Sequence, residues 1–176
     1  MQGMEHRIGG LEKEDGSGVV SHDPMNHQKM VELRQKKVDG IAHDIPDLEV
    51  IGDAKGDLLL LSWGSTYGAA KTAYDVLKAQ GHKLSFAHLR YLNPFPKNLG
   101  DVLHKFDHVV IPELNLGQLK SLIQAKYLKR VIGINKVQGK PFKSVELEEK
   151  ISVLLTMTNI KKWPANATEL DIPVDL

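Results

Sequence analysis

Residues 57–63 of the chain read Asp57-Leu58-Leu59-Leu60-Leu61-Ser62-Trp63, and this short run decides the fold. A strand with one wet face alternates apolar and polar residues, whereas four consecutive leucines need apolar cover on both faces. Strands of this type lie at the centre of a parallel sheet with helices packed on each side. The run therefore predicts the central strand of an α/β fold.

On either side of this run, strand-like and helix-like patterns alternate along the chain. Short apolar runs predict five strands, at residues 48–51, 57–63, 83–89, 108–112 and 130–134. Apolar residues at helical spacing predict helices at 67–79, at 99–106 with Asn98 as its cap, at 117–127, and a last one that Ser144 caps. The link between the first two strands is too short for a helical crossover, so we expect the first strand to run antiparallel to the second. Alternation of this kind predicts a mostly parallel sheet with helices on both faces.

The flanks of the chain differ in pattern from the centre. Asp23-Pro24 is typical of a helix start, and Met30, Leu33, Val38 and Ile41 share one face of the helix that follows. Neither end shows a helix or strand period. We predict an extended N-terminal arm (1–22), an α/β domain (23–155) and an irregular C-terminal tail (156–176).

Composition excludes several classes of function. Lys plus Arg is 23 and Asp plus Glu is 22, so the chain lacks the basic excess of nucleic-acid binders and of polybasic membrane anchors. The absence of cysteine excludes disulfides, zinc–thiolate sites and cysteine-ligated iron–sulfur clusters from this chain. The longest apolar run spans only residues 58–61, and the first ten residues lack a secretory h-region. We therefore expect a soluble cytoplasmic protein.

Ligands and partners of open parallel sheets gather at the carboxyl ends of the strands. Three segments fall there in the predicted sheet: Trp63 to Thr66, Arg90 to Pro96, and Pro112 to Gln118. From them we take nine candidate interface or ligand-facing residues, namely Gly64, Ser65, Thr66, Arg90, Asn93, Phe95, Glu113, Asn115 and Gln118.

Two of these segments leave alternatives open. Gly64-Ser65-Thr66 opens a helix, so its N–H groups and hydroxyls suit an anion, or a hydroxyl simply caps the helix. It matches neither the Walker motif nor GxGxxG. Arg90 suits a carboxylate or phosphate clamp, or an ion pair with Glu113. The rigid apolar loop Asn93-Pro94-Phe95-Pro96 favours an interface anchor over a mere change of chain direction.

The sequence gives no catalytic or metal site. Glu113 as a general base would need a second titratable group, and the nearby Asn115 and Gln118 do not titrate, so structural hydrogen bonding is favoured. None of the eight histidines has a standard metal-ligand spacing, and GxSxG is absent.

Several sequence blocks, taken in order, resemble the end of the alpha subunit of 2-oxoglutarate:ferredoxin oxidoreductases. They are EHRIGGLE (5–12), SHDPMNH (21–27), MVELR (30–34), WGSTYG (63–68), HLRYLNPFP (88–96), PELNLGQL (112–119) and GKPF (139–142). The resemblance covers about residues 5 to 155. It implies a three-layer α/β/α sandwich, similar to the transketolase C-terminal domain, with a five-strand mixed sheet whose first strand is antiparallel.

The same resemblance implies a function that belongs to a larger complex. Such enzymes oxidatively decarboxylate a 2-oxoacid with coenzyme A and thiamine diphosphate, and pass electrons through iron–sulfur clusters to ferredoxin. This chain is expected to be a structural and assembly domain without cofactors or activity of its own, whose partners are the rest of the alpha subunit and the beta subunit. The start at Met1 then suggests an excised domain or a truncated frame. With its native neighbours missing, an exposed Phe95 and nearby apolar groups would favour self-association.

Two other functions compete with this one. The chain is alternatively a stand-alone module that binds a small anion or nucleotide at Gly64 to Thr66. An independent enzyme would need a titratable pair beyond Glu113, which the sequence does not offer. The 2-oxoacid itself is not defined by these residues.

Overall fold

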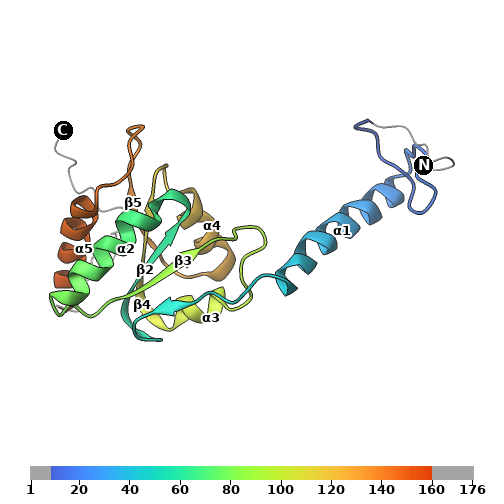
Figure 1. The fold of residues 1–176 in the computed structure, drawn as a ribbon. Helices are drawn as coiled ribbons and strands as arrows, with labels where there is room; N and C mark the ends of the chain where they lie inside the picture. The colour runs from blue at the N-terminus through green and yellow to red at the C-terminus, as the bar shows by residue number, and fades with distance from the viewer. Residues whose placement is uncertain (1–8, 160–176) are drawn as a thin grey trace. The chain divides into compact units, whose positions relative to one another are not determined.

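A computed structural model describes residues 9–159 of the chain, with side chains as far as Thr156. The described residues form two compact units. The first contains residues up to 46 together with Asn93–Phe95, and the second contains residues 47–92 and those from 96 onward. Figure 1 shows the helices and strands of each unit. The predicted tail lies outside the described residues from 160 onward, and the predicted three-part division of the chain stays a prediction.

The second unit is built on one five-stranded sheet with the order β1-β3-β2-β4-β5. Its strands are β1 (Val50–Ile51), β2 (Gly56–Trp63), β3 (Ser85–Leu89), β4 (Phe106–Glu113) and β5 (Ile132–Asn135). The four strands from β2 to β5 are mutually parallel wherever they pair, and β1 is antiparallel to β3. The mixed, mostly parallel five-strand sheet is thus confirmed.

The leucine run lies in the middle of this sheet, as the sequence predicts. β2 pairs with β3 on one side and with β4 on the other, and all four leucines from Leu58 to Leu61 are 0% exposed. Successive side chains of a strand point to opposite faces. Leu58 and Leu60 accordingly join the core on one face, and Leu59 and Leu61 are buried on the other.

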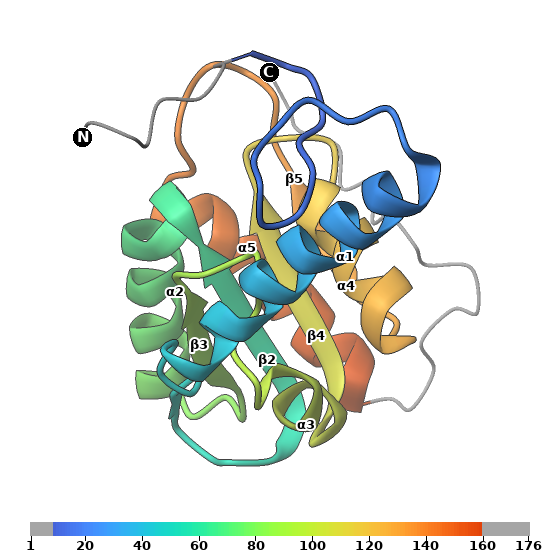
Figure 2. The same cartoon turned by 90° about the vertical axis from the view of Figure 1, so that its right-hand side faces the viewer.

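Helices cover both faces of the sheet and make three layers (Figures 1 and 2). On one face, α2 (Tyr67–Ala79) and α5 (Ser144–Asn159) pack against each other over Leu58 and Leu60. On the other face lie α3 (Leu99–His104) and α4 (Gln118–Tyr127), which both contact β4. None of the helices in the described part of the chain is long and apolar enough to cross a membrane.

The first strand has the predicted direction, and the structure adds its neighbour. β1 is antiparallel to the parallel strands, and it pairs with β3, through Val50 with Ala87 and Ile51 with Phe86. Both sides of β2 are occupied by β3 and β4, so the open edge of β3 is where a short extra strand can add hydrogen bonds.

Asn98 has a different role from the one that the sequence suggests. It precedes α3, but its side chain makes no cap hydrogen bond to that helix. Instead its Nδ2 donates to the Leu48 carbonyl at 3.0 Å, and its Oδ1 accepts from the Leu48 N–H at 2.8 Å. A side-chain amide satisfies both groups of one residue at once, as a strand neighbour would. Asn98 therefore holds the chain just before β1 in place.

The first unit is held together mainly by polar contacts, whereas the second unit has a hydrophobic core. Its helix α1 (Pro24–Gly40) begins at the predicted cap, since Asp23 accepts from the Met25 N–H at 3.0 Å. The short 3-10 turn Ile41–His43 follows it. No residue of α1 is buried, so the predicted apolar stripe is not covered within this unit. Ile41 and Leu33, for example, are exposed.

Glu12 fastens the preceding loop to α1. An isolated bridge joins Lys13 to Val20 and closes the loop. The Arg34 guanidinium donates two hydrogen bonds to the Glu12 carboxylate, at 3.1 and 3.0 Å, and His27 Nδ1 lies 2.8 Å from it. Hydrogen bonds from Arg34, then from His27, lower the pKa of Glu12 from 4.5 to about 2. Fork-to-fork pairing of this kind fixes geometry as well as charge.

The Asn98 hydrogen bonds give a first prediction. Asn98→Ala leaves the N–H and C=O of the buried Leu48 without partners, so the free energy of unfolding should fall by about 1–3 kcal/mol. Urea unfolding followed by circular dichroism measures the change. Gln138→Ala, at an exposed loop amide, is the control and should stay within about 0.5 kcal/mol of the parent chain. Equal effects of the two substitutions would contradict this role of Asn98.

The Glu12 pair gives a second prediction. Because its pKa is lowered, the carboxylate stabilises the loop fully above pH 4.5 and loses this effect as the pH falls through about 2. An NMR titration of the Glu12 carboxyl carbon should show a midpoint near 2. Arg34→Ala removes the largest cause and should move the midpoint up toward 4.5. A midpoint that Arg34→Ala leaves unchanged would show that the guanidinium is not the cause.

Candidate functional site

The carboxyl ends of four parallel strands meet along one edge of the sheet, which we call the strand-end edge. Trp63 at the end of β2 is in register with Leu89 of β3, and Glu113 at the end of β4 is in register with Asn135 of β5. The three predicted segments therefore follow neighbouring strands of one sheet, as expected. A fourth segment, which follows Asn135 at the end of β5, lies at this edge too. The sequence analysis does not include it among the candidates, although it directly follows an apolar strand.

In the turn after β2, the side-chain hydroxyl of Thr66 forms hydrogen bonds within the turn itself. Thr66 is buried, and its Oγ1 donates to the Trp63 carbonyl at 2.8 Å and accepts from the Trp63 N–H at 3.2 Å. Gly64 has a φ of +53°, a left-handed conformation that glycine adopts without strain. Ser65 is exposed. Thr66 makes no side-chain cap hydrogen bond to the helix that begins at Tyr67, because its hydroxyl is engaged with Trp63 instead, and Ser65 remains as the exposed residue with a hydroxyl in this turn.

Glu113 caps a helix from within the protein. Its side chain is 0% exposed, and its two carboxylate oxygens accept from the N–H groups of Leu119 and Lys120, each at 2.9 Å. A carboxylate is favourable at the positive end of a helix dipole, and here it pairs the first free N–H groups of α4. The favoured role of Glu113, structural hydrogen bonding, agrees with this geometry.

Asn115 completes the cap of α4. Its Oδ1 accepts from the Gly117 N–H at 2.8 Å and from the Gln118 N–H at 3.0 Å. Together with Glu113 it satisfies four successive donors at the start of the helix. The start of α4 therefore already holds a charged group of the chain itself, and the Gln118 residue is exposed beside it.

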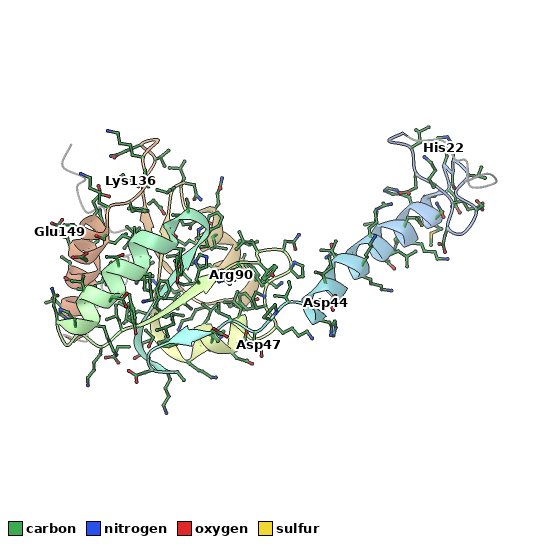
Figure 3. All side chains as sticks on the ribbon, viewed as in Figure 1. His22, Asp44, Asp47, Arg90, Lys136 and Glu149 are labelled. Carbon is green, nitrogen blue, oxygen red and sulfur yellow. The ribbon has the colours of Figure 1, made fainter. Side chains whose placement is uncertain are left out.

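Arg90 does not pair with Glu113. β2 separates β3 from β4, so the two strand ends are two strand spacings apart, roughly 9–10 Å. The Glu113 carboxylate is buried on α4, whereas Arg90 is exposed at the end of β3 (Figure 3). The ion-pair alternative is thus wrong, because the strand order places a third strand between the partners.

A serine and a histidine on neighbouring strands form a contact that the sequence did not suggest. Ser62 and His88 are register partners of β2 and β3, and Ser62 Oγ lies 2.8 Å from His88 Nδ1. The ring of Tyr67 meets the His88 ring edge-on at 4.8 Å. Burial, and then the charge of Arg90, lower the pKa of His88, which favours the neutral imidazole. Ser62 is 0% exposed, so the pair stabilises the sheet and offers no accessible nucleophile.

The loop after β3 corrects one expectation. Phe95 is only 5% exposed, and Pro94 and Pro96 beside it are buried as well, while Asn93 is exposed. The expected exposure of Phe95 is wrong, because the ring is already covered by the chain itself. The roles of Asn93 and Phe95 at an interface stay predictions.

Lys136 fixes the segment after β5. Its Nζ donates to the Glu146 carboxylate at 2.8 and 2.9 Å and to the Pro141 carbonyl at 3.1 Å, with the Lys136 side chain only 7% exposed (Figure 3). The hydrogen bond from Lys136 is the main cause that lowers the pKa of Glu146. This cation is therefore engaged in holding the loop onto α5.

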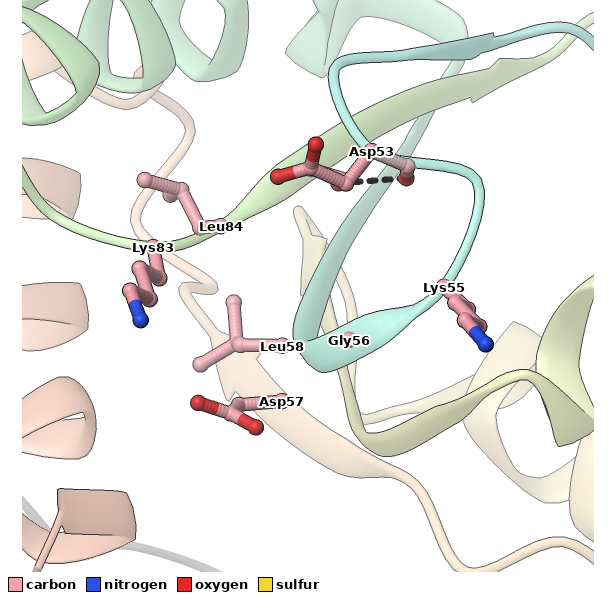
Figure 4. A pocket seen from close by; sticks show the side chains of 8 residues that line it. Asp53, Lys55, Gly56, Asp57, Leu58, Lys83 and Leu84 are labelled. Carbon is pink, nitrogen blue, oxygen red and sulfur yellow. Dashed lines mark hydrogen bonds between the residues drawn. The ribbon is translucent and has the colours of Figure 1, made fainter.

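A shallow pocket lies at the opposite, amino-terminal end of the strands (Figure 4). Two acidic and two basic side chains line it, and Ser85 Oγ at its wall donates to the Asp53 carbonyl at 2.8 Å. The lining charges are Asp53, Lys55, Asp57 and Lys83. Such a balanced, solvent-open surface has no preference for the charge of a ligand. Among the described residues, no group of three or more His, Asp or Glu side chains is placed to hold a metal ion.

The Glu113 cap gives a third prediction. Glu113→Ala leaves two buried N–H groups at the start of α4 without partners, so the free energy of unfolding should fall by about 2–4 kcal/mol. Glu149→Ala, at an exposed carboxylate of α5, is the control and should change it by less than about 0.5 kcal/mol. Urea unfolding of the three proteins measures both values, and a loss below about 1 kcal/mol at Glu113 would refute the cap.

Comparison with known proteins places this sheet in a family. Residues 56–147, from the start of β2 to the first turn of α5, match the family model described as pyruvate:ferredoxin oxidoreductase core domain II. The chain is 52% identical over 155 residues to 2-oxoglutarate oxidoreductase subunit KorA of Mycobacterium tuberculosis, which covers 87% of this chain and 23% of that protein. It is 34% identical over 154 residues to the alpha subunit of 2-oxoacid:ferredoxin oxidoreductase 2 of Aeropyrum pernix, with 84% and 24% covered.

A solved structure agrees with these relatives. The 2-oxoglutarate:ferredoxin oxidoreductase of Magnetococcus marinus, solved with 2-oxoglutarate, coenzyme A and succinyl-CoA bound, superposes with a TM-score of 0.78 and 27% identity. The superposition covers 86% of this chain and 27% of that one. The chain thus spans about a quarter of the length of these relatives. It belongs to the pyruvate:ferredoxin oxidoreductase core domain II family, and within it resembles the alpha subunits of 2-oxoacid:ferredoxin oxidoreductases.

Proposed function

We propose that this chain is the structural and assembly domain of the alpha subunit of a 2-oxoglutarate:ferredoxin oxidoreductase. The single observation that carries the proposal is the 52% identity to the KorA subunit over 155 residues, which includes the whole sheet. The geometry supports a structural role for the domain. Its buried carboxylate caps a helix, its buried lysine holds a loop, and the serine that contacts His88 is inaccessible.

In this proposal the whole complex oxidatively decarboxylates 2-oxoglutarate to succinyl-CoA and passes the electrons to ferredoxin. Thiamine diphosphate, coenzyme A and iron–sulfur clusters serve that reaction in other parts of the complex. Cysteine thiolates hold such clusters, and this chain has none, so its residues do not fit a cysteine-ligated cluster. The chain contacts the rest of the alpha subunit and the beta subunit. A cytoplasmic location stays a prediction from the sequence.

The competing proposal, a stand-alone anion or nucleotide module, has less support. The start of α4 is filled by Glu113 and Asn115, and Thr66 is engaged with Trp63. What remains for an anion is the exposed Ser65 and the exposed Arg90, which follow different strands.

A domain exchange tests the proposed function. We replace the matching 155 residues of the Mycobacterium tuberculosis subunit with this chain and produce the hybrid with its beta subunit. The hybrid complex should reduce ferredoxin with 2-oxoglutarate and coenzyme A at a rate within about tenfold of the parent enzyme, since the sheet and its strand ends are shared.

Two controls make the result decisive. A complex from which the matching residues are deleted should neither assemble nor react, and the isolated chain should show no coenzyme A-dependent oxidation. A hybrid that assembles with its beta subunit but stays inactive would contradict an assembly role, because then more than assembly would depend on this domain. Activity of the isolated chain would contradict it as well.

A further inference from the structure

The strand-end edge exposes one large apolar side chain after each of its four parallel strands. Tyr67 follows β2 and is 45% exposed, Tyr91 follows β3 and is 47% exposed, Leu116 follows β4 and is 83% exposed, and Val137 follows β5 and is 63% exposed. Single exposed apolar residues are ordinary on a protein surface, and here one follows each parallel strand of the same edge, so we take the four together as a candidate contact surface. Exposed aromatic side chains such as those of Tyr67 and Tyr91 are typical of surfaces that contact another protein.

Two buried polar atoms lie at the ends of two strands of the same edge. Trp63 Nε1 and Asn135 Oδ1 have no hydrogen-bond partner, and they are the two such side-chain atoms in the described part of the chain. They belong to the last residues of β2 and β5. A buried donor or acceptor without a partner costs about 1–3 kcal/mol. These two strand ends therefore carry polar groups that the described residues leave unpaired beneath the surface.

The length of the relatives gives a reason to choose one occupant for this edge. This domain makes up about a quarter of the KorA subunit and of the Magnetococcus marinus chain, so some three quarters of each polypeptide are tethered to it. A covalent tether gives an effective concentration in the mM range, well above that of a separate subunit in a cell. An apolar edge is therefore covered first by the chain to which it is joined.

We propose that the strand-end edge is the surface on which the remaining part of the same alpha subunit packs, with Tyr67, Tyr91, Leu116 and Val137 as apolar anchors. This inference rests on the proposed function and adds to it the surface, the anchors and the occupant. Arg90 is exposed just after the end of β3, and we expect it to pair with a carboxylate on the opposing surface.

The chain offers a matched pair of leucines for the test. Leu116 lies just before α4 at the strand-end edge, and Leu128 lies just after α4, with 83% and 91% exposure. Because the chain has no cysteine, Leu116→Cys and Leu128→Cys each introduce one thiol into it. Both are made in the isolated chain and in the hybrid alpha–beta complex described above, and maleimide labelling of each peptide is followed by mass spectrometry.

In the isolated chain both thiols should react at similar rates. In the complex, the thiol at 116 should react at least about tenfold more slowly, as expected of a buried interface side chain, and the thiol at 128 should be unchanged. A benzophenone maleimide at position 116 should cross-link to the remaining part of the alpha subunit. Val137→Cys should behave like Leu116→Cys.

The other outcomes overturn the inference. Equal labelling of 116 and 128 in the complex would show that the edge is not covered. A cross-link from 116 to the beta subunit, or to a second copy of the alpha subunit, would show a different occupant. Failure of the inference is distinct from failure of the proposed function, because ferredoxin reduction by the hybrid reports on the latter whatever the labelling shows.

Discussion

Burial of β2 on both faces is the constraint on which the rest of the second unit depends. Four adjacent leucines with no exposed surface require a helix layer on each side, and burial of each contributes about 2 kcal/mol. α2 with α5 on one side and α3 with α4 on the other supply this cover. Parallel neighbours on both edges of β2 then follow from the helical crossovers between strands.

The parallel arrangement also explains how the strand-end edge is organised. Parallel strands bring their carboxyl ends, and the starts of the following helices, to one edge, where free N–H groups collect. The chain satisfies these groups largely from within. Glu113 and Asn115 cap α4, Thr66 closes the turn before α2, and Lys136 binds Glu146 after β5. Thr66, Glu113, Asn115 and Lys136 are thus engaged within the chain, while large apolar side chains and Arg90 are exposed at the edge, which favours packing against protein over anion chemistry.

The first unit is held together by different interactions from those of the second unit. Helix α1 buries no residue, and the loop before it is held by Glu12, Arg34 and His27. Contacts between such exposed charged groups fix geometry but contribute little free energy in water. This unit therefore has a defined shape without the hydrophobic core that stabilises the second unit.

The sequence by itself determined the strands, the central strand, the helices and the cap at Asp23, because these depend on local periodicity and on residues a few positions apart. The tertiary structure alone decided what depends on long-range placement. The neighbour of β1, the pairing of Asn98 with Leu48 and the contact of Ser62 with His88 join residues that are 26 to 50 positions apart. It also decided that Arg90 and Glu113 stay apart and that Phe95 is covered. Strand order and loop packing set these distances, and no local pattern encodes them.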